Sequence, residues 1–538
     1  MADAVVIGAG QNGLVAANAL ADAGWEVLVL EAGPEPGGAV RSDRGVHPDY
    51  VSDLCSAFYP LGAASPAMRA LGLERHGLRW RHAPAVLAHP LPDGRCAVLE
   101  RAPDATAAGL ESLGAGDGEA WLRLYGLWER MGEELLRALF TPFPPIRPVP
   151  ALAAAARRAG ALDALRTLLS PVRTLGEREF AGPGGPLLLA GSTGHTDLSP
   201  ESAGGAAFGW LLAMVGQRYG WPVPEGGAGE LTAALVRRLE AAGGRVRCGV
   251  PVTSVIVRDG RALGVRTADG EAVRAVRAVL ADVSAPALYG GLVGWEHLPG
   301  RLREQMRRFD WDPATFKVDW ALTGPIPWAS PGAARAGTVH LVPDMDSLTR
   351  YNADLATGRV PAEPFALLGQ MTTADPARSP AETESVWAYT HVPHRVRGDA
   401  GPDGVTGAWD ERERVAFAER LEGAVERLAP GFRERIAARR IVAPPDFADH
   451  NASLPGGALN GGTSLPHQQL VFRPVPGLGR AETPVAGLFL ASASAHPGGG
   501  VHGGCGTNAA RAALAHASPA GRLVLTPALA ALRRALTG

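Results

Sequence analysis

Cysteine, lysine and long apolar runs are all scarce in this chain of 538 residues. The four cysteines, Cys55, Cys96, Cys248 and Cys505, are scattered without a CxxC pair, which predicts reduced packing thiols rather than a disulfide framework. The formal net charge is −2 and no run of basic residues stands out, so we expect no nucleic-acid partner. The longest strongly apolar stretch, residues 206–216, is too short to cross a bilayer.

Several catalytic arrangements are absent as well. No Ser/His/Asp set, no pair of carboxylates at catalytic spacing and no cluster of metal ligands is evident, so we expect no metal site. The first apolar run begins almost at once, without a charged leader, which predicts a cytoplasmic location. The length is sufficient for two or three domains. The sequence gives no indication of the oligomeric state.

Lysine is the rarest charged residue. Of the 52 basic residues, all but Lys317 are arginine. Alternation in residues 311–324 predicts a strand with Phe316, Val318 and Trp320 on one face, and Lys317 and Asp319 on the other. A buried lysine can lose its proton and act as a base, which makes Lys317 a catalytic candidate. The alternative is a lysine that survives by chance on the surface.

The strongest motif that is present lies at the N-terminus, in VVIGAGQNGLVAANALADAGWEVLVLE from Val5. The pattern predicts a strand, a glycine turn, a helix, a second strand and a terminal acid, which is a dinucleotide-binding βαβ unit. Gly8 permits the sharp turn, Gly10 permits close approach of a pyrophosphate, and Gly13 permits close packing of the helix. Glu31 is placed to accept hydrogen bonds from a ribose. The alternative is a glycine turn that serves packing alone.

Two further glycine-rich segments extend this site. Gly37 and Gly38, followed by Arg41, offer a second backbone loop to the same pyrophosphate, which favours FAD over NAD. Near the C-terminus, ASASAHPGGGVHGGCGTNAARAAL predicts a loop that leads into a helix starting near Gly506. Bare backbone beside a helix N-terminus stabilises negative charge, here the charge that a reduced flavin develops near its pyrimidine carbonyl. A glycine-rich loop without a ligand is the alternative.

The intervening chain divides into further segments. Residues 104–178 are helical in pattern, with an apolar set that we expect in the core: Trp121, Leu122, Leu124, Tyr125, Trp128 and Met131. Residues 151–175 form amphipathic helices with arginines on one face, either a surface pair or a lid that meets lipid or an apolar substrate. Residues 226–283 predict a helix and then strands with hairpin turns at Asp259-Gly260 and Asp269-Gly270.

We therefore expect a discontinuous FAD-binding domain made of residues 1–83, 218–285 and 481–538. Residues 84–217 would form a largely helical substrate or lid region, and residues 286–480 the substrate domain. A helix at 410–428 would cover the sheet of that domain.

Taken together, the segments VVIGAGQNGLVAANALADAGWEVLVLEAGPEPGGAVRS, GWPVPEGGAGELTAAL and ASAHPGGGVHGGCGTNAARAA resemble the phytoene-desaturase-like FAD oxidoreductases. The resemblance covers nearly the whole chain. It implies an α/β fold with a Rossmann-like FAD-binding domain of the glutathione-reductase and amine-oxidase type, and an α+β substrate domain with a mixed sheet and helical cover. It also implies non-covalent FAD and an apolar substrate cavity.

By matching position, the resemblance assigns the cofactor-binding residues. They are Gly8, Gly10, Gly13, Glu31, Ala32, Gly37, Gly38, Arg41, Val252, Gly499, Gly500, Val501 and Asn508. One departure stands out, because this chain reads GGCGTNAA where relatives often read GAPGRNAA. The exchange removes an arginine and introduces Cys505 near the ring, so a covalent cysteine–flavin bond is an alternative to a packing thiol.

The expected function is an FAD-dependent oxidoreductase that acts on an extended hydrophobic, polyene-like small molecule. Desaturation, isomerisation and flavin-dependent cyclisation, as in natural-product tailoring, all fit this expectation. The alternatives are an amine or amino-acid oxidase of the same fold and a non-catalytic lipid-escort protein of related fold. Candidates for proton handling are Lys317, His195, His496 and His502. Peripheral contact with a membrane is a further expectation.

Overall fold

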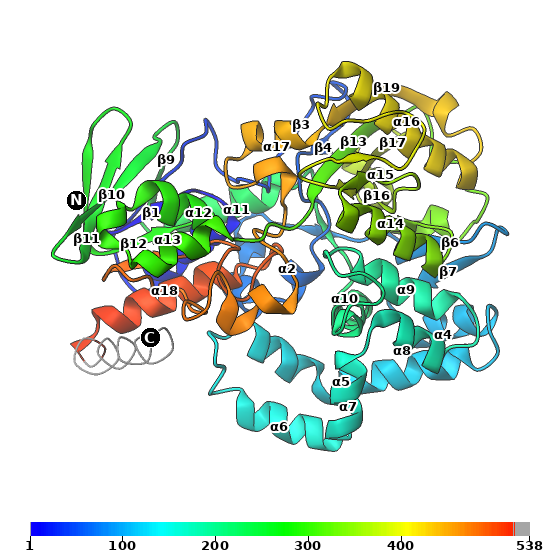
Figure 1. The fold of residues 1–538 in the computed structure, drawn as a ribbon, viewed down its shortest axis with the longest axis horizontal. Coiled ribbons are helices and arrows are strands. Elements are labelled where there is room, and N and C mark those ends of the chain that lie inside the picture. The colour runs from blue at the N-terminus through cyan, green and yellow to red at the C-terminus, as the bar shows by residue number, and fades with distance from the viewer. Residues whose placement is uncertain (1, 520, 522–538) are drawn as a thin grey trace.

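The computed structural model describes residues 2–519 and 521, which form two lobes, each built on a seven-stranded sheet (Figure 1). The sheet of the first lobe has the order β10-β11-β12-β1-β2-β9, with β20 paired to β12. Its strands are β1 (Ala2–Ile7), β2 (Val27–Leu30), β9 (Arg245–Arg247), β10 (Val252–Arg258), β11 (Arg261–Thr267), β12 (Ala272–Ala281) and β20 (Leu488–Leu490).

Parallel pairing joins β9, β2, β1, β12 and β20, and this part of the sheet is covered on both faces. The near-continuous apolar composition of β1 and β2 suits burial on both sides. Three helices pack on one face: α1 (Gln11–Asp22), α11 (Gly229–Ala241) and α18 (Gly504–Ala517). The predicted βαβ unit and both hairpins are confirmed, and Asp259 and Gly260 adopt the positive φ that a tight turn requires.

The sheet of the second lobe has the order β19-β13-β17-β16-β14-β6-β7. Its strands are β6 (Ala85–Pro90), β7 (Cys96–Leu99), β13 (Ala314–Leu322), β14 (Ala336–Leu341), β16 (Ala366–Gln370), β17 (Glu384–Val392) and β19 (Ile436–Val442). The predicted alternation on β13 is confirmed. Phe316, Val318 and Trp320 lie under α16 (Glu411–Leu428), whose N-terminus is capped by Asp410.

The opposite face of this sheet, here called the inner face, is directed toward the first lobe and the helical region. Lys317 and Asp319 lie on it, as do Trp387 and Tyr389, which are their direct partners across β13 and β17. Because side chains alternate along a strand, the same register that buries Phe316 under α16 brings these four residues to the inner face.

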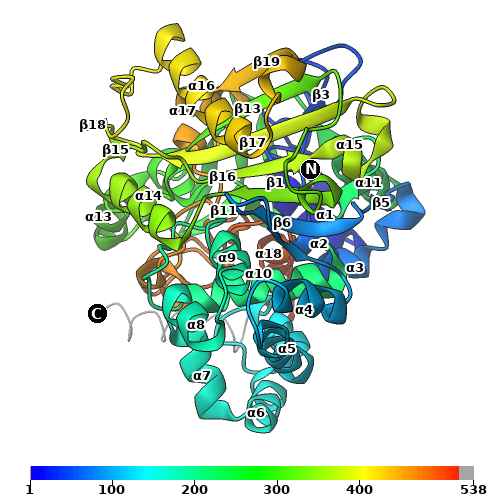
Figure 2. The same ribbon diagram turned by 90° about the vertical axis from the view of Figure 1, so that its right-hand side faces the viewer.

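Helices form the third part of the molecule, and Figures 1 and 2 place them below the second sheet. They are α4 (Pro103–Glu111), α5 (Asp117–Leu139), α6 (Val149–Arg158), α7 (Ala161–Leu169), α8 (Val172–Glu179), α9 (Gly184–Thr193) and α10 (Gly205–Tyr219). Trp121, Leu124, Trp128 and Met131 are buried in one core with residues of α9 and α10, as expected. Leu122 is an exception: it is exposed, because it lies on the face of α5 that points away from these helices.

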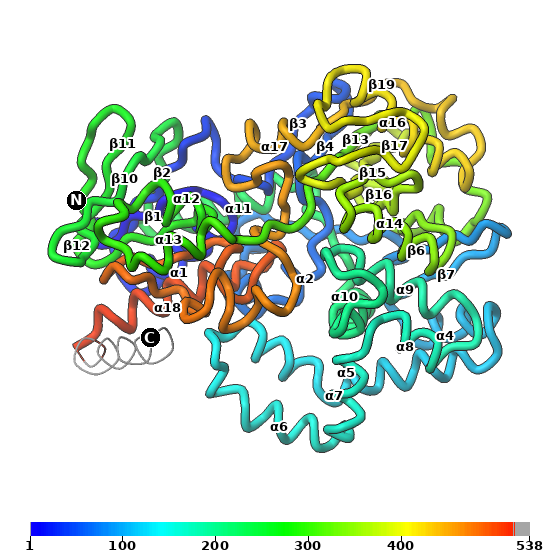
Figure 3. The backbone as a smooth tube through the Cα atoms, viewed as in Figure 1, coloured from blue at the N-terminus to red at the C-terminus, as the bar shows by residue number. Residues whose placement is uncertain are grey.

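The tube in Figure 3 shows how the chain leaves the first lobe for β6, β7 and the helices and returns to it with α11 and β9–β12. It then crosses to the rest of the second sheet and returns again with β20 and α18. None of the helices in the described residues has both the length and the apolar character needed to cross a bilayer. The predicted domain limits stay predictions, and the end of the segment 481–538 lies outside the described residues.

Candidate functional site

The glycine turn after β1 is packed so closely that side chains are excluded from it. Gly8 has a φ of +91°, and a Cβ on Gly13 would lie 2.3 Å from the Gly8 carbonyl oxygen. The turn therefore needs glycine for both the backbone conformation and the contact with α1. Gly10 precedes α1, whose N-terminus carries no side-chain cap. Uncapped N–H groups at a helix N-terminus suit an anion such as a pyrophosphate.

Asp282, which follows β12, is a member of this site that the sequence analysis did not single out. Its carboxylate accepts a hydrogen bond from the Gly13 N–H at 2.7 Å, and a Cβ on Gly10 would lie 2.6 Å from the same carboxylate. Burial, with a smaller contribution from the charge of Glu31, raises the pKa of Asp282 to about 7, although the hydrogen bond from Gly13 opposes the shift. The sequence could have indicated Asp282 only by its position directly after a predicted strand, because the parallel strands β1 and β12 end at the same edge of the sheet.

Glu31 ties the glycine turn to the loop after β2. One carboxylate oxygen accepts from the Ala9 N–H at 2.7 Å, and the other accepts from the Gly33 N–H at 2.8 Å. Each carboxylate oxygen has a second lone pair, so Glu31 keeps the capacity to accept from a ribose hydroxyl. Ala32 is the next residue in the chain. The Glu31 carbonyl accepts a hydrogen bond from the Val250 N–H, which brings the start of β10, at Val252, close to the loop after β2.

The second glycine pair lies against the first turn. The Gly37 N–H donates to the Ala9 carbonyl at 2.9 Å, and a Cβ on Gly38 would lie 3.3 Å from the Gly10 Cα. Both residues have positive φ. Arg41 donates to the carbonyls of Gly38 and His450 at 3.1 and 2.8 Å, so its guanidinium fastens this loop in place. The structure thus brings together the two backbone loops predicted to meet one pyrophosphate.

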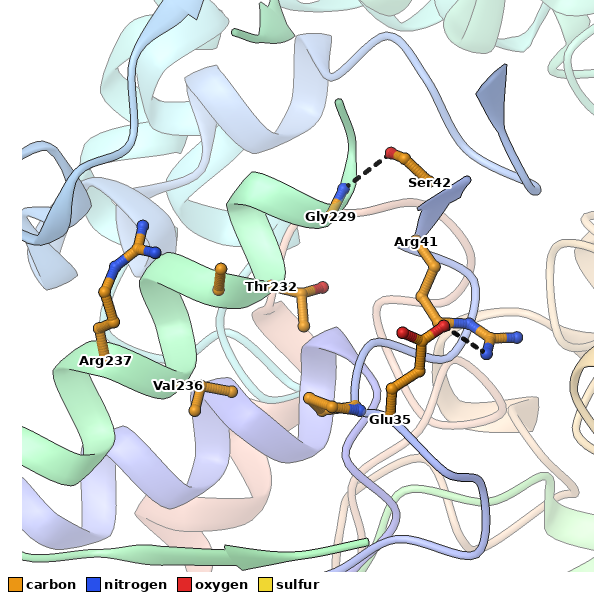
Figure 4. A pocket seen from close by; sticks show the side chains of 9 residues that line it. Glu35, Arg41, Ser42, Gly229, Thr232, Val236 and Arg237 are labelled. Carbon is orange, nitrogen blue, oxygen red and sulfur yellow. Dashed lines mark hydrogen bonds and ion pairs between the residues drawn. The ribbon is translucent and has the colours of Figure 1, made fainter. Parts of the chain in front are cut away.

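A surface pocket of about 350 Å³ adjoins this loop, between α11 and residues 35–42 (Figure 4). Arg41 is the one predicted cofactor residue that lines it, and Figure 4 shows the Arg41 guanidinium paired with Glu35. Ser42 accepts from the Gly229 N–H at the other side. The pocket lies on the outer side of the loop and does not include the glycine turn.

The C-terminal motif meets the N-terminal motif directly. A Cβ on Gly506 would lie 2.0 Å from the Asn12 carbonyl oxygen, so α18 packs on the first turn of α1. The Gln11 side chain accepts from the Gly503 N–H at 3.0 Å and contacts the Gly500 carbonyl at 3.5 Å. Val501 faces the short helix α2 (Pro60–Ala64) through Gly62. Segments almost 500 residues apart therefore form one glycine-lined region.

Two amide groups in this region favour a ligand. The side-chain oxygens of Asn12 and Asn508 are buried and have no hydrogen-bond partner among the described residues. Buried polar atoms are nearly always satisfied, so unsatisfied ones beside two glycine loops indicate a bound molecule that donates hydrogen bonds. Glycine-lined turns, the N-terminus of α1, where Asp282 holds the Gly13 N–H, and these two acceptors together fit an extended dinucleotide such as FAD.

His496 and His502 flank the C-terminal loop. The His502 Nδ1 accepts from the Gly504 N–H at 3.0 Å, and its Nε2 donates to the carbonyls of Gly498 and Gly499, both at 3.2 Å. The His496 Nε2 donates to the Thr141 carbonyl at 3.1 Å. Burial lowers the pKa of each histidine to about 4, so both rings are neutral near pH 7.

His195 belongs to a different cluster. Its Nε2 lies 3.0 Å from the Nε2 of His340, and its ring packs edge-on against Trp221. Burial lowers the pKa of His195 to about 3. The structure therefore brings two of the three candidate histidines to the predicted flavin loop and places the third among the aromatic residues between α9 and the second sheet.

Lys317 is buried rather than on the surface, so the interpretation of a chance surface lysine is wrong. Its ammonium forms an ion pair with Asp319 and donates to the Asp53 carbonyl at 3.0 Å. Asp319 also pairs with Arg440 at 3.0 Å, and Arg440 pairs with Asp43 at 2.7 Å. We call Lys317, Asp319, Arg440 and Asp43 the interlobe ion chain, because it links β13 and β19 to residues 43–53. The arrangement favours a positioning role for Lys317, and its catalytic role stays a prediction.

A second buried network runs beside it. Arg378 is fully buried and pairs with Asp53 at 3.0 Å and with Asp375 at 3.1 Å. Asp375 accepts from the Gly226 N–H at 2.7 Å, and Asp53 accepts from the Ala228 N–H at 2.8 Å. Local sequence carried no signal for Arg378, because almost every basic residue of this chain is an arginine.

The inner face of the second sheet continues from Lys317 into an aromatic row. The rings of Trp387 and Tyr389 are stacked with centroids 5.8 Å apart, and Phe58 lies 6.2 Å from Trp387. His391 extends the row along β17, 5.6 Å from Tyr389. Burial raises the pKa of Tyr389 well above its usual value, so the phenol stays neutral and the row carries no charge.

Cys505 is enclosed by the C-terminal loop. Its thiol is fully buried and donates to the carbonyls of Ala495 and Gly498 at 3.4 and 3.5 Å. Burial raises the pKa of this thiol to about 12, which keeps it protonated. Because covalent attachment needs a thiolate, the surroundings favour a packing thiol. In the part of the chain that the structure describes, no group of three metal-ligating side chains gathers.

The comparisons with known proteins agree with this geometry. A protein of Mus musculus named pyridine nucleotide-disulfide oxidoreductase domain-containing protein 2 is 28% identical, over 94% of this chain and 92% of its own. A neurosporene-forming phytoene desaturase of Cereibacter sphaeroides is 27% identical, over 98% of this chain and 96% of its own.

Solved structures of similar fold include an oxidoreductase from Methanosarcina mazei, with a TM-score of 0.61, 17% identity and coverage of 95% of this chain and 99% of that one. A putrescine oxidase variant has a TM-score of 0.59 at 16% identity and covers 95% of this chain and 98% of its own. These likenesses concern the fold, and they confirm the predicted α/β architecture with an FAD-binding domain and a substrate domain.

The sequence profile described as flavin-containing amine oxidoreductase matches residues 13–315, which is more than half of the chain. The match begins in the first turn of α1 and ends on β13, so it includes Asp282 and most of the first sheet. The chain therefore belongs to the flavin-containing amine oxidoreductase family and is an FAD-dependent oxidoreductase related to the phytoene desaturases.

Proposed function

We propose that this enzyme oxidises an extended hydrocarbon substrate of the polyene type by desaturation. The observation that carries the proposal is the aromatic row of Phe58, Trp387 and Tyr389 on the inner face of the second sheet. An apolar molecule is held there by burial of its surface and needs no charged partner. The curated relatives include phytoene desaturases and a limonene dehydrogenase subunit, whose named substrates are hydrocarbons.

In this proposal the bound FAD supplies a hydride acceptor. The chain orients the hydrocarbon along the aromatic row and excludes water from the region between Phe58 and Trp387. The substrate also loses a proton, which we assign to the imidazole of His496, because it is neutral near pH 7, whereas both ring nitrogens of His502 are already hydrogen-bonded to the backbone. Isomerisation and cyclisation would use the same inner face and are outcomes of the test below.

The proposal predicts that a substitution in the aromatic row slows the reduction of the flavin by a polyene substrate. The Trp387→Leu enzyme, with its FAD content unchanged, should lose at least about tenfold in the rate of anaerobic flavin reduction by an acyclic polyene in detergent, because the stacked ring no longer orients the substrate. Trp295→Leu is the matched control, since Trp295 lies in the first lobe against Arg303. Analysis of the product separates desaturation from isomerisation and cyclisation.

Other results would contradict this assignment. Rapid flavin reduction by primary amines, with none by polyenes, would establish an amine oxidase instead. Equal rates for Trp387→Leu and the wild type would remove the aromatic row from the substrate site.

We also propose a binding partner for the protein: helices α6 and α7 dock on an anionic membrane surface. These helices form the far end of the molecule in both views (Figures 1 and 2). Large apolar side chains are exposed there, with Leu162 at 82% and Ile146 at 74%. Further exposed members are Val149, Leu165 and Leu169. Residues 141–170 contain four arginines and one acidic residue, Asp163, so the segment complements anionic lipid and would repel a second copy of itself.

Flotation with liposomes tests this surface. We expect the wild type to bind vesicles that contain anionic phosphatidylglycerol, and the triple variant Leu162→Gln, Leu165→Gln, Leu169→Gln to bind at least about tenfold less, because each lost leucine removes buried apolar area. A matched control carries Val276→Gln and Leu470→Gln, two exposed apolar side chains elsewhere. Equal binding of the triple variant and the wild type would refute the proposal, as would absence of binding by the wild type.

A further inference from the structure

Arg473 is a buried cation that the proposed chemistry does not use. The side chain is 1% exposed and lies beneath the C-terminal glycine loop. Its guanidinium donates to backbone carbonyls only: Ala493 at 2.8 and 2.9 Å, Asn460 at 2.7 Å, Thr463 at 3.0 Å and Gly462 at 3.5 Å. It therefore joins residues 460–463 to the segment that leads into the loop.

No ion pair with a carboxylate engages Arg473 among the described residues. The two carboxylates whose charges act on the pKa of Arg473, those of Asp312 and Asp197, are occupied by other donors. Asp312 accepts from the N–H groups of Asn460 and Gly462, and Asp197 accepts from the Ser464 N–H and the Thr463 hydroxyl. Buried charges in proteins are usually paired, so a guanidinium held by carbonyls alone leaves its charge open to another anion.

The guanidinium lies directly against the loop expected to face the flavin. A Cβ on Gly498 would lie 3.3 Å from the Arg473 Cζ, and Gly498 has a φ of +111°, so only glycine fits there. The other titratable groups at the loop are uncharged near pH 7, since burial lowers the pKa of His496 and of His502 to about 4 and raises that of the Cys505 thiol to about 12. Arg473 is thus the cation next to this loop.

We propose that Arg473 is a positioning residue that stabilises the reduced flavin electrostatically and so raises its affinity for electrons. Two electrons and one proton, taken from a donor, leave the flavin ring with one negative charge near its pyrimidine end. A fixed, buried cation stabilises that charge more than it stabilises the neutral oxidised ring. Arg473 supplies this charge to the C-terminal loop from a segment outside the loop.

The test uses the FAD-loaded enzyme without any substrate, so its outcome is independent of the proposed hydrocarbon. The flavin is titrated with dithionite in the presence of a redox indicator dye. At a fixed ratio of reduced to oxidised dye, Arg473→Gln should lower the ratio of reduced to oxidised flavin by at least about tenfold, and Arg473→Lys by less than about threefold. The control Arg350→Gln removes an exposed arginine of α14 (Met345–Thr357) and should leave the ratio unchanged.

A second variant applies if Arg473→Gln fails to fold or to retain FAD. Gln469 lies beside the same glycine, with its side-chain oxygen 3.5 Å from the position of a Gly498 Cβ. Gln469→Glu keeps Arg473, removes the Gln469 hydrogen bond to the Thr463 carbonyl and adds a negative charge beside the loop that offsets the charge of Arg473, so it should also lower the flavin ratio. An unchanged ratio in either FAD-loaded variant would mean that Arg473 only fastens the loop, and the proposal would be wrong.

Discussion

Replacing Lys317 with methionine is expected to lower the free energy of unfolding by about 3–5 kcal/mol, because removing one partner of a buried ion pair leaves the other charge uncompensated. Lys317 and Asp319 are almost fully buried, and Asp319 is shared with Arg440. The loss also breaks the contact with the Asp53 carbonyl, which joins β13 to the segment 43–53. Urea unfolding followed by tryptophan fluorescence measures the change.

A surface pair provides the comparison. Arg245 and Glu26 form an exposed ion pair at 2.8 Å, and Arg245→Met should cost less than about 1 kcal/mol. If Lys317→Met unfolds like the wild type and keeps its FAD but loses turnover, Lys317 acts in catalysis and the structural role assigned to the interlobe ion chain is wrong.

The second large effect concerns the glycine turn. Gly13→Ala is expected to weaken FAD binding by at least about a hundredfold, which corresponds to about 2.7 kcal/mol. The new Cβ would lie 2.3 Å from the Gly8 carbonyl oxygen and 3.0 Å from the Asp282 Cβ, so α1 must move away from the turn. The helix N-terminus that stabilises the pyrophosphate would move with it. Quenching of FAD fluorescence during titration of the apoprotein gives the dissociation constant.

Gly109→Ala is the matched control for this substitution. Gly109 lies in α4, and nothing lies within 4 Å of its Cβ position, so FAD binding should stay the same and helix stability should rise slightly. If Gly13→Ala binds FAD as tightly as the wild type does, the pyrophosphate does not depend on the packing of α1 against the glycine turn.

Elements governed by local backbone chemistry could be predicted from the sequence. The strand, glycine turn and helix around Gly8, the hairpin at Asp259-Gly260 and the alternation on β13 all depend on residues within a few positions of each other. A glycine at a position of positive φ and the alternation of apolar residues along a strand can both be recognised from residue type and spacing. Likeness to known flavoproteins then added the cofactor, which the family match confirms.

Elements governed by long-range contacts could not be predicted in this way. Arg440 pairs with Asp43 across 397 positions of the chain, and Arg473 donates to the carbonyl of Ala493 across 20 positions that include β20. Since nearly every basic residue here is an arginine, composition cannot tell a buried arginine from an exposed one. Leu122 was assigned to the core for a similar reason, because helical spacing does not reveal where the neighbouring helices end.

The sequence alone therefore determined the class of this protein, a flavoprotein with a discontinuous nucleotide-binding lobe, because glycine turns and strand periodicity are local properties. Only the tertiary structure shows which charged groups are buried and which partners they have, and therefore which role each is favoured to play. It buried Lys317 in an ion pair, placed Asp282 against the glycine turn and left Arg473 without a carboxylate partner among the described residues. Burial and pairing are set by segments distant in the chain, and they determine which charges remain available to a ligand.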